Sequence, residues 1–303
     1  MRAGGRKQMK LKIQARAKIN WTLDVVGVLP NGYHDLDMLM QSVTLCDQMT
    51  MEDADALTLS VRMGGGYVPA DESNLVLRAA RALQAHTGCT KGAAITLRKY
   101  IPVAAGMGGG SSDAAAALKG LNVLWGLGLS DDALEEIGLM VGADVPFCIR
   151  GGLQRAQGVG ERLTPIAMKR PLYIVAFQPC RGLSTKEVFT ALHEDGIRDE
   201  DRPDNEAAQR ALQNGDVRLL GRSLGNVLEP VSRRLRPDID KAIREIEAAG
   251  AVGARMTGSG SAVFGVFLHA GACRKAAQEL QKTYPACRMM RTAECGVVIA
   301  EDA

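Results

Sequence analysis

The sequence predicts an α+β fold made of two domains, and three observations lead to this prediction. Segments with strand periodicity and segments with helix periodicity are mixed along the chain. The length of 303 residues is enough for two domains. A connector over 165–171 begins and ends with proline and precedes an apolar strand expected at 172–177. We therefore expect an N-terminal domain over 1–165 and a C-terminal domain over 166–303.

In the first half, alternating apolar and polar residues predict strands, and apolar residues at helical spacing predict helices. Asn74 suits the N-cap of the first helix, Ser111 or Ser112 suits the N-cap of the second, and Asp113 suits its first turn. The expected strands cover 10–17, 24–28, 38–45, 56–61 and 94–99. The expected helices cover 74–86, 112–125 and 131–141.

The second half contains more helices and a second glycine-rich turn. Ile239, Ile243 and Ile246 fall on one stripe of a helix, as expected for a helix packed on a core. The segment 253–268 has the pattern of a strand, a glycine turn and a strand. The expected helices cover 186–192, 205–214, 217–224, 237–249 and 272–283, and a final strand covers 296–300.

The segment 102–118 reads PVAAGMGGGSSDAAAAL and places a glycine-rich turn directly before an alanine-rich helix. Glycine lacks a Cβ, so the backbone can turn sharply and approach a ligand closely. Unpaired N–H groups and the positive end of the dipole at a helix start favour an anion. We expect a polyphosphate here; the alternative is a plain connection into a packed helix. The expected contacts are Pro102, Gly106, Met107, Gly108, Gly109, Gly110, Ser111 and Ser112.

Three common phosphate-binding patterns do not fit this loop. A Walker A loop is excluded because two serines, rather than a lysine, follow Gly110. A dinucleotide-binding loop is excluded because the sixth position counted from Gly106 is Ser111. The V-A-I-K, H-R-D and D-F-G motifs of protein kinases are absent from the sequence.

The loop resembles the central signature of the GHMP small-molecule kinases, Pro-x-x-x-Gly-Leu-Gly-Ser-Ser-Ala. Met107 stands at the usual leucine position, and an additional glycine precedes the serines. ARAKINWTL at 15–23 and GARMTGSGSAVFG at 253–265 resemble the other two motifs of the family. The resemblance implies a two-domain GHMP kinase fold with the active site in the inter-domain cleft, and ATP as cofactor.

Four blocks resemble the branch of this family that phosphorylates the 2-hydroxyl of a CDP-linked methylerythritol in isoprenoid precursor synthesis. They are AKIN at 17–20, NGYH at 31–34, GADVPF at 142–147 and GVGE at 158–161. Two alternatives stay open. One is a GHMP kinase for another alcohol, such as homoserine or mevalonate, and the other is a nucleotide-binding or regulatory protein without catalytic activity.

Phosphoryl transfer requires an anion pocket, a base for the acceptor hydroxyl and a cation. Asp144 is the candidate base, because it lies in an apolar turn where an unpaired carboxylate would be costly. The resemblance implies that Lys18 is its partner and that both flank the acceptor hydroxyl. Such an ammonium would keep the carboxylate ionised and offset charge in the transition state. The alternative roles are a solvated strand lysine and a helix-capping aspartate.

A cytidine ring offers a π face and a hydrogen-bonding edge, so its pocket needs aromatic and polar side chains. The resemblance implies that Tyr33 stacks on cytosine, that His34 bonds its edge and that Asn20 contacts the methylerythritol hydroxyls. A looser match places Phe189 against the other face of the ring; the alternative is a core phenylalanine on a short helix. Asp144 also counts among the substrate contacts.

The remaining site residues follow from the resemblance too. Asn74 either caps its helix or reaches the adenine. Thr257 and Gly258 are expected against the phosphates, and the alternative for them is a plain strand connection. Mg²⁺ should accompany ATP, held chiefly by phosphate oxygens, with Ser112 as a candidate ligand and no carboxylate ligand identified. The other histidines, His86, His193 and His269, are interpreted as surface or packing residues.

Bulk properties exclude several classes of partner. A net charge of +3 is too small to indicate nucleic acid. No segment has the roughly 18 consecutive apolar residues of a membrane span, and the basic N-terminal segment lacks the apolar region of a secretory signal. Seven cysteines without a C-x-x-C pair argue against disulfides and a zinc site. We expect a cytoplasmic enzyme with a small-molecule substrate, present as a monomer or weak homodimer.

Overall fold

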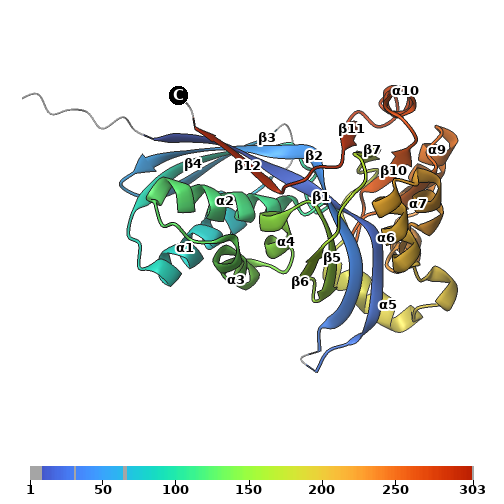
Figure 1. The fold of residues 1–303 in the computed structure, drawn as a ribbon, viewed down its shortest axis with the longest axis horizontal. Coiled ribbons are helices and arrows are strands. Elements are labelled where there is room, and N and C mark those ends of the chain that lie inside the picture. Colours follow the sequence, from blue (N-terminus) through green and yellow to red (C-terminus); the bar gives the residue numbers. More distant parts are fainter. Residues whose placement is uncertain (1–8, 31, 64–66, 302–303) are drawn as a thin grey trace, which may run out of the picture.

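A computed structural model describes residues 9–30, 32–63 and 67–301, which form two lobes side by side (Figure 1). Asn31 of the NGYH block lies outside the described residues. Within these described ranges, no helix is both long and apolar enough to cross a membrane.

An eight-stranded sheet forms the first lobe, with the central order β12-β1-β2-β4-β3. Strands β5 and β8 extend it by pairing with β2 and β1, and β6 pairs with β5. The strands are β1 (Lys10–Val28), β2 (His34–Ala54), β3 (Leu57–Met63), β4 (Gly92–Lys99), β5 (Leu153–Gly158), β6 (Arg162–Pro165), β8 (Gly225–Asn226) and β12 (Val297–Glu301).

The two strands expected at 10–17 and 24–28 are a single strand, β1, so this prediction was wrong. Residues 15–23 alternate strictly between apolar and polar side chains, with Lys18 and Asn20 at polar positions, and their backbone is paired with β2. Register shifts between Arg16 and Lys18, and between Asn20 and Thr22, mark irregularities in the ladder. Such bulges change the direction of side chains next to functional sites. Here they lie next to Lys18 and Asn20, two residues expected at the site.

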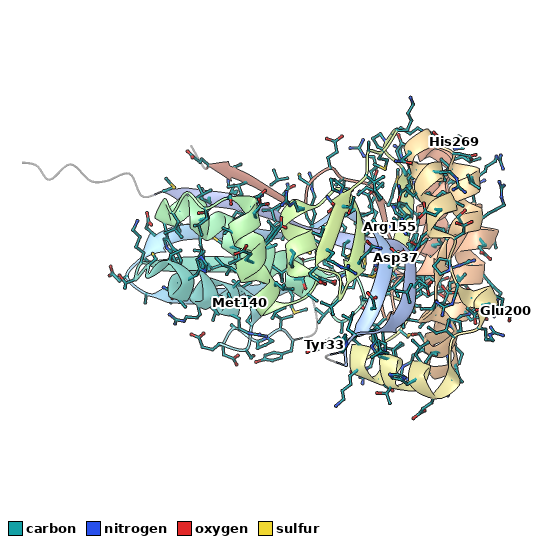
Figure 2. The ribbon with its side chains drawn as sticks, turned by 60° about the horizontal axis from the view of Figure 1, so that its bottom comes forward. Tyr33, Asp37, Met140, Arg155, Glu200 and His269 are labelled. Atoms are coloured by element: carbon teal, nitrogen blue, oxygen red, sulfur yellow. The ribbon has the colours of Figure 1, made fainter. Side chains whose placement is uncertain are left out.

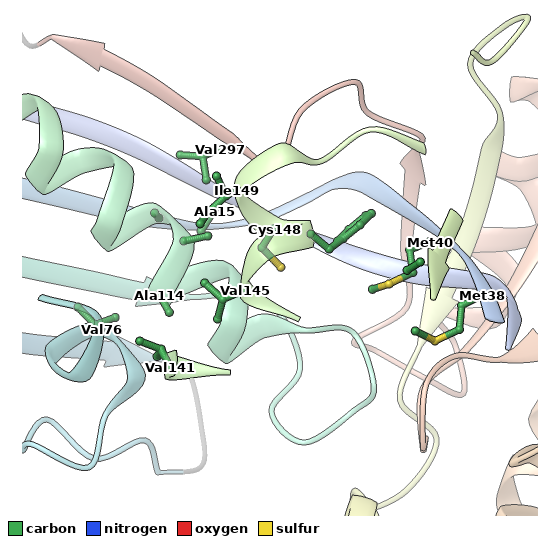
Figure 3. Close-up of a cluster of buried hydrophobic side chains, with 14 of the residues drawn as sticks. Ala15, Met38, Met40, Val76, Ala114, Val141, Val145, Cys148, Ile149 and Val297 are labelled. Carbon is green, nitrogen blue, oxygen red and sulfur yellow. The ribbon is translucent and has the colours of Figure 1, made fainter. Parts of the chain in front are cut away.

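Three helices contact this sheet, α1 (Leu75–Thr87), α2 (Gly109–Trp125) and α4 (Val145–Arg150), and α3 (Asp131–Val141) packs against these helices. The alanines at 114–117 are fully buried, so α2 lies close to its neighbours in the apolar core (Figure 3). The predicted cap of α1 is confirmed, because Asn74 Oδ1 accepts a 2.9 Å hydrogen bond from the N–H of Val76. The six-residue α4 was not predicted, since it is too short for a periodic pattern.

The predicted start of α2 was wrong. The helix begins at Gly109, three residues earlier than expected, and its N-cap is Gly108 rather than a serine. Ser112 Oγ instead donates hydrogen bonds to the carbonyls of Arg16 at 2.7 Å and Gly108 at 3.0 Å. Glycines have poor helix propensity, so the sequence pattern hid the first turn.

The second lobe contains an antiparallel sheet in the order β11-β7-β10-β9. Alternate residues of β7 belong to two different hydrophobic cores. Val175 and Phe177 pack with residues of α9 and α10. Ile174 and Ala176 pack with residues of α6 and α7. The strands are β7 (Tyr173–Phe177), β9 (Gly253–Met256), β10 (Val263–Phe267) and β11 (Arg288–Arg291). The helices are α5 (Thr185–Asp195), the short 3₁₀ helix η1 (Asp199–Asp201), α6 (Asn205–Asn214), α7 (Val217–Ser223), α8 (Glu229–Leu235), α9 (Asp238–Ala248) and α10 (Ala270–Leu280).

Both lobes share structural elements. The change of sheet falls between β6 and β7, next to the expected connector, but β8 and β12 return to pair with β1 of the first sheet. Trp21 of β1 also packs edge to face against Phe264 of β10, with ring centroids 5.6 Å apart. A domain boundary after residue 165 therefore stays a proposal, because later segments complete the first sheet.

Candidate active site

A cavity of about 1050 Å³ is lined by residues of both lobes, including β1, the glycine loop before α2, the start of α4, the start of α5 and the glycine turn between β9 and β10. This volume is at the upper end of ordinary ligand pockets. Three residues expected at the site, Met107, Ser112 and Thr257, are buried and do not line it. The expected residues that do line it are Lys18, Asn20, Tyr33, His34, Asn74, Pro102, Gly106, Gly108, Gly109, Gly110, Ser111, Asp144, Phe189 and Gly258.

The glycine loop has the backbone shape of an anion site. Gly106 and Gly108 have φ angles of +79° and +69°, which side chains disfavour. The first N–H groups of a helix have no partner within it, and in α2 they belong to Gly109, Gly110 and Ser111, which line the cavity. The loop thus presents backbone donors and the positive end of the helix dipole to the cavity.

Lys18 and Asp144 form an ion pair in the cavity wall, with 3.6 Å between Nζ and Oδ2. Lys18 is buried, so it is not a solvated strand lysine, and its Nζ also donates a 2.8 Å hydrogen bond to Asn20 Oδ1. Asp144 occupies the N-cap position of α4, but its side chain makes no capping hydrogen bond. With 34 % of this side chain exposed, the carboxylate can meet a ligand while Lys18 holds it.

Sequence reasoning missed a second charged cluster at the glycine loop. Lys99 Nζ donates a 2.6 Å hydrogen bond to Asp113 Oδ2 and another to Asp47 Oδ2. Asp47 Oδ1 accepts the N–H of Ile101 at 2.9 Å and that of Tyr100. All three charged side chains are buried, and Lys99 and Asp113 line the cavity. The cluster therefore links the end of β4, which precedes the glycine loop, to α2, which follows it.

The charges of this cluster are unequal, with two carboxyl groups and one ammonium. Burial and the neighbouring Asp47 raise the pKa of Asp113 well above its ordinary value. Burial alone would lower the pKa of Lys99, but the carboxylates of Asp113 and Asp47 outweigh it and raise that pKa. The expectation that Asp113 lies in the first turn of α2 was wrong because the helix starts earlier. One signal was available, since strand alternation places Lys99 on the same face as Ile95 and Leu97.

Aromatic residues also line the cavity. Tyr33 is exposed near the tip of the β1–β2 hairpin (Figure 2). His34 and Phe189 lie ring against ring, with centroids 4.4 Å apart and planes inclined by 31°. His193, which was interpreted as a surface or packing residue, is exposed, and its ring centroid lies 5.1 Å from that of His34. Burial, and then His193, lower the pKa of His34.

The second glycine turn, over 256–260, packs directly on the first loop. Gly258 and Ser259 line the cavity, and a Cβ on Gly106 would lie 2.1 Å from the carbonyl oxygen of Thr257. Thr257 itself faces β1, where its Oγ1 accepts a 3.0 Å hydrogen bond from the N–H of Asn20. Ser259 Oγ lies 3.0 Å from Thr185 Oγ1, at the start of α5.

In the part of the chain that the structure describes, no group of three or more histidine, cysteine, aspartate or glutamate side chains is arranged to hold a metal ion. Ser112, the candidate Mg²⁺ ligand, is buried and directs its hydroxyl to two backbone carbonyls. Any divalent cation here would depend mainly on oxygens of its nucleotide and of water.

Comparisons with known proteins agree with this geometry. The chain matches the N-terminal domain of the GHMP kinases over 74–152 and their C-terminal domain over 208–286. It is 42 % identical to 4-diphosphocytidyl-2-C-methyl-D-erythritol kinase of Pelotomaculum thermopropionicum over 275 residues, which cover 91 % of this chain and 95 % of the relative. It is 39 % identical to the enzyme of the same name from Clostridioides difficile over 290 residues, covering 95 % and 97 %.

Solved structures show the same likeness. A crystal structure of 4-(cytidine 5'-diphospho)-2C-methyl-D-erythritol kinase superimposes with a TM-score of 0.77 at 33 % identity, covering 93 % of this chain and 99 % of the other. Homoserine kinase from Cytophaga hutchinsonii superimposes with a TM-score of 0.75 at 20 % identity, covering 99 % of each chain, which shows a shared fold alone.

Proposed function

The chain belongs to the GHMP kinase family, and from this premise we propose that it transfers the γ-phosphoryl group of ATP to the 2-hydroxyl of 4-diphosphocytidyl-2-C-methyl-D-erythritol. In this proposal the enzyme is a phosphotransferase of the non-mevalonate isoprenoid pathway. Its relatives, matched over 95 % and 97 % of their length, are named 4-diphosphocytidyl-2-C-methyl-D-erythritol kinase. One observation carries the proposal: the Lys18–Asp144 pair stands 3.6 Å apart in a cavity shared with the glycine loop.

The residues divide the work of phosphoryl transfer as follows. The N–H groups at the start of α2 hold the phosphates and orient the terminal group. Asp144 accepts the proton of the acceptor hydroxyl while that oxygen bonds to the γ-phosphorus and the bond from phosphorus to the β–γ bridging oxygen breaks. Lys18 lies 3.6 Å from the carboxylate of Asp144, which it orients, and it offsets negative charge on the transferred group. ADP then leaves, and Asp144 returns its proton to water.

Mg²⁺ belongs to the proposal as the partner of ATP, where it would neutralise charge on the β- and γ-phosphates. The residues present fit a cation bound mainly by phosphate oxygens. Asp113 also lines the cavity, but its carboxylate already accepts a hydrogen bond from Lys99. Asp144 and Ser111 also carry oxygen atoms in the cavity lining and could contribute to such a site.

For the acceptor, Tyr33, His34 and Phe189 supply the aromatic and imidazole groups that a cytosine ring requires. Phe189 lies against the ring of His34, so the two residues proposed to contact cytosine are neighbours in the cavity wall. Asn20 is placed to contact the methylerythritol, since it lines the cavity next to Lys18. A monomeric or weakly dimeric, cytoplasmic enzyme remains part of the proposal.

An ADP-release assay with a panel of alcohols tests the function. We expect turnover with the CDP-linked methylerythritol and little with homoserine or mevalonate. Faster turnover of homoserine or mevalonate would reassign the substrate. ATP binding without turnover of any alcohol would favour a regulatory protein on the same fold.

A further inference from the structure

Two buried side chains, Asn226 and Glu229, form hydrogen bonds to the backbone of the second glycine turn. The mechanism above uses neither of them. Asn226 Nδ2 donates hydrogen bonds to the carbonyls of Met256 at 3.0 Å and Gly258 at 2.9 Å. Asn226 Oδ1 accepts the N–H of Leu228 at 3.0 Å. Glu229 Oε2 accepts the N–H of Met256 at 2.8 Å. Neither Asn226 nor Glu229 lines the cavity, so their influence on a ligand must pass through the turn.

These bonds fix both neighbours of Thr257, and Thr257 connects the turn to the ion pair. Its Oγ1 accepts the N–H of Asn20 at 3.0 Å. Asn20 Oδ1 in turn accepts a 2.8 Å hydrogen bond from Lys18 Nζ, which lies 3.6 Å from Asp144. A continuous series of polar contacts thus runs from Asn226 to the ion pair.

The backbone of Asn226 is fixed to the strand that bears Lys18. Asn226 in β8 pairs with Leu23 of β1, and the N–H of Val227 donates a 3.0 Å hydrogen bond to the carbonyl of Leu23. The Asn226 side chain therefore bridges β1 and the glycine turn. Because the turn packs backbone against backbone on Gly106, this bridge also sets the distance between the turn and the glycine loop.

We propose that Asn226, assisted by Glu229, is a positioning residue for phosphoryl transfer. It holds Thr257 where its hydroxyl orients Asn20, and Asn20 orients the ammonium of Lys18 beside Asp144. The proposal rests on the kinase function above and adds a specific residue to it. An amide suits this position because its two N–H groups serve two carbonyl oxygens at once. An aspartate of the same shape would direct a carboxylate at both carbonyls.

The test is Asn226→Asp, with Asn122→Asp as the matched control. Asn122 makes the same kind of contacts far from the cavity, since its Nδ2 donates to the carbonyl of Leu129 at 3.0 Å and its Oδ1 accepts the N–H of Leu129 at 3.0 Å. We expect Asn226→Asp to lower kcat about 10- to 100-fold, as misplaced catalytic groups do. KM for ATP should change less than about threefold in this variant, and Asn122→Asp should leave kcat unchanged.

A double-mutant cycle with Thr257→Val separates positioning from general destabilisation. If Asn226 acts through Thr257, the double variant loses no more activity than Thr257→Val alone, whereas independent effects multiply. The proposal would be overturned if the activity losses of Asn226→Asp and Thr257→Val multiplied in the double variant. Equal kcat values for Asn226→Asp and Asn122→Asp would also overturn it. If the wild-type chain turned over no acceptor, the proposed function would fail. A crystal structure of Asn226→Asp would still test this inference through one hydrogen bond. Loss of the contact between Thr257 Oγ1 and the Asn20 N–H would support it, and an unchanged contact would refute it.

Discussion

The side chain of Lys18 crosses directly over Gly108, so closely that a Cβ at position 108 would lie 2.9 Å from Lys18 Cγ. The N–H of Lys18 also donates a 3.0 Å hydrogen bond to the carbonyl of Met107. The strand that carries Lys18, the proposed catalytic cation, and the loop proposed to hold the phosphates therefore pack as one unit. A change in the loop backbone is expected to move the ammonium.

Gly108→Ala should lower kcat because the new methyl group displaces Lys18. Gly126→Ala is the matched control, since both glycines have φ of +69° but a Cβ at position 126 would meet nothing within 4 Å. Both variants should lose about 1–2 kcal/mol of stability from the left-handed backbone, measured by urea unfolding. Only Gly108→Ala should reduce kcat, and equal kcat values would show that Lys18 tolerates the methyl group.

Asp144→Asn should lower kcat by about 10²–10⁴-fold, the range for loss of a general base. The amide keeps the shape of the carboxylate but cannot accept the proton, while the glycine loop still binds ATP. Rapid-quench kinetics and equilibrium binding of ATP measure the two effects. Unchanged kcat would remove Asp144 from the mechanism, and a large loss of ATP affinity would indicate a structural role.

Tyr33→Ala should raise KM for the cytidine substrate while leaving KM for ATP nearly unchanged, because Tyr33 lines the cavity and is the proposed stacking partner of cytosine. Loss of one stacked base contact costs about 1–3 kcal/mol, or roughly 5- to 150-fold in affinity. Tyr100→Ala serves as the control, since Tyr100 is exposed but does not line the cavity. If both KM values rose together in Tyr33→Ala, the cause would be a general folding defect.

Lys99→Met should destabilise the protein by about 3–5 kcal/mol, because it leaves two carboxyl groups buried without a cation. Asp113→Asn should cost much less, since Asp47 and Lys99 remain as a balanced pair. The pKa of Asp113 is raised in the folded state, so its ionisation opposes folding as pH rises above the ordinary value of 3.8. Wild-type stability relative to Asp113→Asn should therefore fall as pH rises. Urea unfolding at several pH values measures this difference, and a constant difference would contradict it.

His193→Asn should shift the pH dependence of KM for the cytidine substrate. Neutral His34 can accept a hydrogen bond from the cytosine amino group, and protonated His34 cannot. Burial and His193 lower the pKa of His34 below its ordinary value of 6.5, so KM should rise only at more acidic pH. Removing His193 takes away one of the two causes that lower the pKa of His34, so this pKa should rise. As the pH falls, KM of the variant should therefore begin to rise at a higher pH than KM of the wild type. Identical profiles for wild type and His193→Asn would exclude this coupling.

Local patterns in the sequence predicted much of the fold. The helices at 131–141 and 205–214 have the predicted bounds, and the cap at Asn74 is confirmed. Short elements such as α4 and β8 were missed because two to six residues cannot display a period. The start of α2 was misplaced because glycines, which favour turns in sequence, form its first turn here.

The sequence, with its resemblance to the GHMP kinases, predicted which residues supply the chemistry, and these roles stay a proposal: the glycine loop, Lys18, Asp144 and the aromatic block. Their types and order along the chain express local backbone preference and functional group, which need no knowledge of distant contacts. Only the tertiary structure decided which groups meet, namely Lys99 with Asp47 and His34 with His193. These contacts join positions far apart along the chain, and the packing of strands and helices that brings them together leaves no local pattern.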